Sequence, residues 1–114
     1  MTPLARKRQW LQTFGCCLSG REDCDLIHLH EGSGTSSNQK VGDHLTLPMS
    51  RLLHIEQHRS PAFWARALPG EDPKHWAVRL HDIWEKRNLD EAQALFSDMR
   101  YVANRDYLAE VLSR

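Results

Sequence analysis

The chain has 114 residues, with 15 basic and 15 acidic side chains and no formal net charge at pH 7. This length suits one domain with a modest hydrophobic core and excludes two independently folded ones. The charge balance produces no overall positive field, so any nucleic-acid binding must use a local basic patch.

The cysteine count and the hydropathy of the chain indicate the cellular compartment in which the protein is expected. The three cysteines are an odd number, and no basic start followed by an apolar stretch indicates a signal peptide. We therefore expect a cytoplasmic protein. No apolar run approaches the ~20 residues that span a bilayer, so no membrane partner is expected.

The first predicted element is a short amphipathic helix that begins at Pro3 and ends at Gly15. The densest basic run of the chain lies within it, at Arg6, Lys7 and Arg8. This run is either a solvated helix face or a local patch that contacts DNA. The apolar residues of the helix are expected to pack on the core: Leu4, Trp10, Leu11 and Phe14.

Two short predicted strands flank a loop of glycines and small polar residues. The strands are expected over residues 26–30 and 43–48, where apolar and polar residues alternate. Alternate residues of a strand share a face, so His28 and His30 are expected to point the same way. The loop over residues 31–42 is either a flexible connector or a backbone-rich lining for an anion.

A helix is predicted from Leu52 to Arg59, with Ser50 as its N-cap. It places His54 and His58 one turn apart on the same face. Two imidazoles at this spacing can reach a common metal ion. The pair is therefore a candidate two-point clamp for one divalent metal.

The rest of the chain has helical periodicity. A short segment starts at Pro61 and ends near Leu68, and a longer helix opens at Asp72 and Pro73, which combine an N-cap with a first-turn proline. Its apolar stripe is predicted to be core: Trp76, Ala77, Leu80, Ile83 and Trp84. Two further helices are marked by Leu89, Ala92, Leu95, Phe96 and Met99, and by Tyr107, Leu108, Val111 and Leu112.

Part of this pattern resembles a known family. Asp43-His44-Leu45-Thr46-Leu47-Pro48-Met49, then His54-Ile55-Glu56-Gln57-His58 and Phe63-Trp64, are similar to the core of small, often prophage-encoded, HNH-type nucleases. The family run has an early cysteine, a strand histidine, a glycine loop with lysine and aspartate, a Pro-Leu-Cys-x-x-Cys-His segment and a later histidine. The resemblance implies one α+β domain over residues 1–114, with a ββα-metal core at 16–64 and a helical extension at 65–114.

The resemblance also implies roles for individual residues. His28 matches the strand histidine, the general base that activates water. His54 and His58 match histidines of the helix and would hold one divalent ion. Lys40 would contact phosphate, and Asp43 would orient the base or complete the coordination. The implied activity is hydrolysis of DNA phosphodiester bonds in a bacterial or phage-infected cell.

The chain departs from the family pattern at a structural zinc site. Ser50 and Leu53 stand where the family has two zinc cysteines, and neither can replace a thiolate. Cys16 or Cys17 with Cys24 would be half a site, so we expect no structural zinc there and expect Leu53 to be buried instead. By ligand type alone, a different site remains an alternative: Cys16, Cys17, Cys24 and His44.

The predicted catalytic site also has few acidic ligands, because Ile27 and not a carboxylate precedes His28. Two imidazoles alone bind Mg2+ poorly, and Mn2+, Ni2+ or Zn2+ suits them better. His30, Asp43 or Asp25 could complete the coordination, with His30 favoured by its place on the strand face.

Three functions are compatible with these observations. The first is a metal-dependent DNA endonuclease of HNH type. The second is a ββα fold that has lost catalysis and survives as a nucleic-acid or protein-binding module of phage or prophage origin, which the missing cysteines and the neutral charge favour. The third is a purely structural helical protein with incidental histidines.

Overall fold

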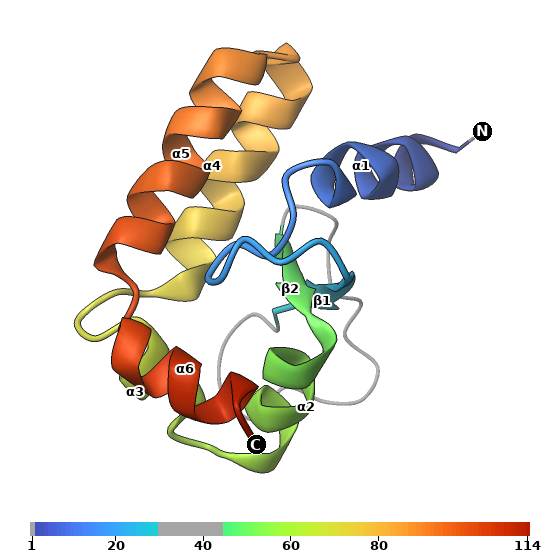
Figure 1. Ribbon diagram of the computed structural model, residues 1–114. Helices are drawn as coiled ribbons and strands as arrows, with labels where there is room; N and C mark the ends of the chain where they lie inside the picture. Colours follow the sequence, from blue (N-terminus) through green and yellow to red (C-terminus); the bar gives the residue numbers. More distant parts are fainter. Residues whose placement is uncertain (1, 30–44) are drawn as a thin grey trace, which may run out of the picture.

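The computed structural model describes residues 2–29 and 45–114 (Figure 1). In this part of the chain the fold is α+β, with six helices and a two-stranded antiparallel sheet. The elements follow in the order α1 (Pro3–Gln12), β1 (Cys24–His28), β2 (Thr46–Ser50), α2 (Arg51–Arg59), α3 (Phe63–Ala67), α4 (Pro73–Lys86), α5 (Leu89–Val102) and α6 (Arg105–Leu112).

The sheet lies centrally, between α1 and the C-terminal helices (Figure 1). Helices α4 and α5 pack side by side, while α2, α3 and α6 contact one another near the C-terminus. Strand β2 runs directly into α2, so the chain order here is strand, strand, helix. None of the helices in the described ranges is long and apolar enough to cross a membrane.

The strands occupy slightly different residues from those predicted. β1 begins two residues earlier than expected and β2 ends two residues later, and Cys24 pairs with Ser50 while His28 pairs with Thr46. Every residue of β2 is buried, so apolar alternation cannot mark its ends. Pairing between the strands, and not local pattern, decides where each begins and ends.

Helices α1 and α4 begin at Pro3 and Pro73, as the sequence indicated, whereas α2 begins one residue before the predicted Leu52 and α3 begins two residues after the predicted Pro61. Asp72 caps α4 by accepting a hydrogen bond from the Lys74 backbone N–H, and Pro73 occupies the first turn. Ser50 is the N-cap residue of α2, yet its side chain makes no capping hydrogen bond. Asn88 and Asn104 cap α5 and α6 through their side-chain oxygens.

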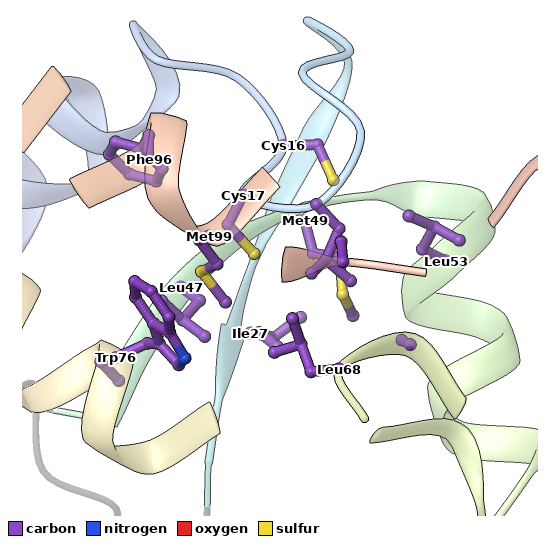
Figure 2. Close-up of a cluster of buried hydrophobic side chains, with 14 of the residues drawn as sticks. Cys16, Cys17, Ile27, Leu47, Met49, Leu53, Leu68, Trp76, Phe96 and Met99 are labelled. Atoms are coloured by element: carbon purple, nitrogen blue, oxygen red, sulfur yellow. The ribbon is translucent and has the colours of Figure 1, made fainter. Parts of the chain in front are cut away.

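The core forms where the sheet meets the surrounding helices (Figure 2). Leu47 and Met49 of β2 are fully buried, and so is Leu53 of α2, as the sequence predicted. The stripe on α4 is also buried, which confirms its assignment to the core: Trp76, Ala77, Leu80, Ile83 and Trp84. Because Leu53 packs into this core, the start of α2 is held firmly against the sheet.

A tight turn connects α1 to the sheet region. Gly15 has a φ of +78°, in the left-handed region that favours glycine. Arg100 of α5 donates hydrogen bonds to the carbonyl oxygens of Phe14 at 2.6 Å and Cys16 at 3.0 and 3.1 Å. The Cys17 backbone N–H then donates to the carbonyl of Pro48 at 2.8 Å, which attaches the turn to β2.

Candidate functional site

Helix α2 brings two imidazole rings together. The ring centroids of His54 and His58 are 4.9 Å apart, and their Nε2 atoms are 3.1 Å apart. Helical geometry alone explains this, because residues four apart lie one turn above each other on the same face. The predicted two-point arrangement of these residues is therefore present.

Strand β1 contributes a carboxylate to the same pair. Asp25 Oδ2 lies 3.1 Å from Nδ1 of His54, and Asp25 Oδ1 lies 3.4 Å from a guanidinium nitrogen of Arg51. The hydrogen bond from His54 is the main cause that lowers the pKa of Asp25, and Arg51 adds to the effect. A carboxylate on β1 thus binds the far side of a histidine on α2.

A cavity of about 280 Å3 lies beside these residues. His28 borders it from β1, and His54 and His58 border it from α2. Its remaining lining residues are Leu26, Ile27 and Gln57. His28, His54 and His58, which the sequence singled out, therefore border one cavity.

The donor set can be compared with the requirements of a metal ion. Two imidazole nitrogens bound to one zinc ion are about 2.9 Å apart at a right angle and about 3.3 Å apart at a tetrahedral angle. The Nε2 atoms of His54 and His58, at 3.1 Å, fall within this range. Nitrogen donors also suit Zn2+ or Ni2+ better than Mg2+. The spacing and the donor type of His54 and His58 therefore fit an ion such as Zn2+ or Ni2+.

Within residues 2–29 and 45–114, no group of three or more histidine, cysteine, aspartate or glutamate side chains is placed to hold a metal. Asp25 was a candidate additional ligand, but its carboxylate contacts Nδ1 of His54 and not the side where the two Nε2 atoms meet. The other candidate ligands, His30 and Asp43, lie outside the described residues, and so does Lys40, the predicted phosphate contact.

Two of the three cysteines lie in the hydrophobic core, and the third lies on β1 next to Asp25. Cys16 and Cys17 are fully buried in the core (Figure 2). Cys24 is half-buried on β1, and all three cysteines are free thiols. Burial raises the pKa of Cys17, while a hydrogen bond from Cys17 lowers the pKa of Cys16. His44, the fourth residue of the alternative cysteine site, is outside the described residues.

The positions that differ from the family's zinc site have distinct environments. Ser50, opposite Cys24 in the sheet, has a buried hydroxyl with no hydrogen-bond partner among the described residues. Leu53 is fully buried in the hydrophobic core. Apolar packing therefore occupies the position where the family pattern has a second cysteine.

The basic run of α1 is divided by its environment. Arg6 and Arg8 are exposed, whereas Lys7 is only 2% exposed and its Nζ lies 2.9 Å from Nδ1 of His81 on α4. Lys7 thus contributes to the packing of α1 against α4. The surface that α1 could offer to DNA phosphates contains Arg6 and Arg8.

Two contributors to the site were not singled out by the sequence. Gln57 borders the cavity, and Arg51 contacts Asp25. Both lie three residues from His54 on α2, so helical spacing from that histidine was a signal that could have identified them.

Comparison of the chain with family models, curated proteins and solved structures gave no match.

Proposed function

We propose that this protein is a metal-dependent endonuclease of the ββα-metal type, which hydrolyses DNA phosphodiester bonds. One observation carries the proposal: His28 of β1 and both histidines of α2 border the same cavity. The strand, strand, helix order of β1, β2 and α2 supports it, because this is the order of a ββα-metal core.

The proposed reaction uses the histidines in two roles. His28, an exposed residue at the end of β1, accepts a proton from the water that attacks phosphorus. Imidazole suits this role because its ordinary titration range lies near neutral pH. His54 and His58 would hold one divalent ion through Nε2, and when bound this ion would stabilise negative charge on the phosphate.

The resemblance assigns two further roles. Lys40 would contact phosphate and Asp43 would orient the base, and both lie outside the described residues. Arg6 and Arg8 are exposed cations that could attract the DNA backbone. The proposed partner is DNA, and the proposed cofactor is one divalent ion, with Mn2+, Ni2+ or Zn2+ favoured over Mg2+ by the nitrogen donors.

A nicking assay tests this proposal. Supercoiled plasmid is incubated with the protein and Mn2+, Mg2+, Ni2+ or Zn2+, and the assay is repeated with His28→Ala and His54→Ala. We expect metal-dependent nicking that both substitutions reduce by about 100-fold or more, because general-base and metal contributions are of this size. His75→Ala is the matched control, since His75 is 83% exposed on α4 and lies outside the cavity lining.

The assay also identifies the second candidate function, a binding module without catalysis. The burial of Leu53 favours that candidate, because apolar packing stabilises the start of α2 where the family pattern has a zinc-binding cysteine. If the protein retains DNA in a filter-binding assay but nicks it with none of the metals, the endonuclease proposal is wrong and the binding module is supported. If the protein neither nicks nor binds DNA, the result would support the third function, a structural helical protein whose histidines are incidental.

A further inference from the structure

Four side chains from β1 and α2 form a continuous chain of polar contacts. Arg51 contacts Asp25 at 3.4 Å, Asp25 contacts Nδ1 of His54 at 3.1 Å, and Nε2 of His54 contacts Nε2 of His58 at 3.1 Å. Three members lie on α2, at the spacings expected of one helix face, and only Asp25 comes from the sheet. Asp25 is therefore the residue of this set that connects the helix face to β1.

The protonation of His54 follows from the chemistry of its partners. An ionised carboxylate can only accept hydrogen bonds, so the proton between Asp25 and His54 belongs to Nδ1 of the imidazole. A neutral imidazole carries one N–H, so Nε2 of His54 then has a lone pair and acts as an acceptor. In the metal-free protein the N–H of the contact between the two rings therefore comes from Nε2 of His58, and that proton would move to Nδ1 of His58 or be released when His58 binds a metal through Nε2.

The place of Asp25 in the fold makes this arrangement rigid. Asp25 pairs with the fully buried Met49 of β2, so the strand register determines where its carboxylate lies. The opposite element is equally constrained, because Leu53, next to His54, is fully buried in the core. The contact between Asp25 and His54 is thus held by two packed elements and not by a loop.

We propose that Asp25 is a positioning residue, which keeps His54 protonated on Nδ1 and so presents the Nε2 lone pair of His54 as a metal ligand. This role rests on the proposed function only where it concerns the metal. Histidines that bind metals usually donate their other ring N–H to a carboxylate or carbonyl, which orients the ring and raises its basicity. The nitrogen ligand so prepared suits Zn2+ or Ni2+ and not Mg2+.

The first test is the tautomer of His54 in the metal-free protein. Long-range 1H–15N NMR at mildly alkaline pH, where ordinary imidazoles are neutral, distinguishes a protonated from an unprotonated ring nitrogen. We expect a proton on Nδ1 of His54 and none on Nε2. In Asp25→Ala we expect a large population with the proton on Nε2. Asp25→Asn, which retains a neutral acceptor, should give an intermediate population.

The second test is metal affinity, measured by calorimetric titration with Zn2+ or Ni2+ alone. Asp25→Ala should weaken binding by about 10- to 100-fold, the usual effect of losing such a partner. Asp25→Asn should weaken it less. Asp23→Asn is the matched control, because Asp23 is an exposed neighbour that should leave both the tautomer and the affinity unchanged.

The outcomes separate this proposal from the proposed function. A proton on Nε2 of His54 in the wild-type protein would overturn the positioning role, and so would an unchanged tautomer in Asp25→Ala. Because the wild-type spectrum alone is decisive, the test survives if a variant fails to fold. The expected tautomer in a protein that binds neither ion would refute the metal site but uphold the action of Asp25 on His54.

Discussion

The turn at Gly15 allows a quantitative test of how the sheet is attached to the N-terminal helix. A Cβ atom at Gly15 would lie 2.9 Å from the carbonyl oxygens of both Gly20 and Arg21, closer than real Cβ atoms approach. Gly70 has nearly the same φ, +77° against +78°, but a Cβ there would have nothing within 4 Å. The two glycines therefore separate the cost of the backbone conformation from the cost of the clash.

The expected free energies follow from this comparison. A left-handed conformation costs a residue with a Cβ roughly 1–2 kcal/mol. Lower entropy of the unfolded chain offsets about 0.4–1 kcal/mol of this. Gly70→Ala should therefore reduce the free energy of unfolding by about 1 kcal/mol. Gly15→Ala should reduce it by about 1–3 kcal/mol more, the usual range for overpacking against atoms that cannot easily move.

Urea unfolding of the two variants measures the difference. With a typical m value of about 2 kcal/mol per molar urea, the midpoint of Gly15→Ala should lie roughly 1 M below that of Gly70→Ala. Gly20→Ala is a second control, because its nearest contact would be the Arg100 side chain at an ordinary 3.7 Å. Equal losses for Gly15→Ala and Gly70→Ala would refute the argument that close backbone approach requires glycine at this turn.

Two further predictions concern α2 and its contact with β1. Leu53→Ala should reduce the free energy of unfolding by about 2–5 kcal/mol, because it leaves a cavity in the core, whereas Leu52→Ala, at a residue 45% exposed, should cost much less in the same urea assay. The pKa of Asp25 is lowered in the folded protein by its contacts with His54 and Arg51, so these contacts stabilise the fold. The whole contribution is present when the pH is above the unfolded pKa of about 3.9, and it is lost as the pH falls through the lower folded pKa. Asp25→Asn should therefore lose less stability than the wild type between about pH 5 and pH 2, and parallel curves would contradict this assignment.

The position of the strands illustrates what local pattern could not predict. The expected strands, 26–30 and 43–48, differ from the observed ones, because β1 begins and ends two residues earlier and β2 begins three residues later and ends two residues later. Cys24 and Asp25 belong to β1 because they pair with Ser50 and Met49, which are far along the chain. That displacement has a functional consequence, since it places Asp25 on a strand and within reach of His54.

The environment of Lys7 is a second example. Composition does not distinguish Lys7 from its exposed neighbours Arg6 and Arg8, although helical spacing puts it on the same face as Leu11, four residues further along. Lys7 is buried because α1 packs so that its amine meets His81, 74 residues away in sequence. A charge run predicts a helix face, but the packing partner decides which charges remain at the surface.

The amino-acid sequence by itself determined the features that depend on near neighbours in the chain. The cap at Asp72, the buried stripe of α4 and the paired imidazoles of His54 and His58 all follow from hydrogen bonds and spacings within one helix. Only the tertiary structure decided that His28 borders the same cavity as this pair and that Asp25 contacts His54 from a strand. Contacts between elements depend on which apolar faces are buried together, and this is a property of the whole core.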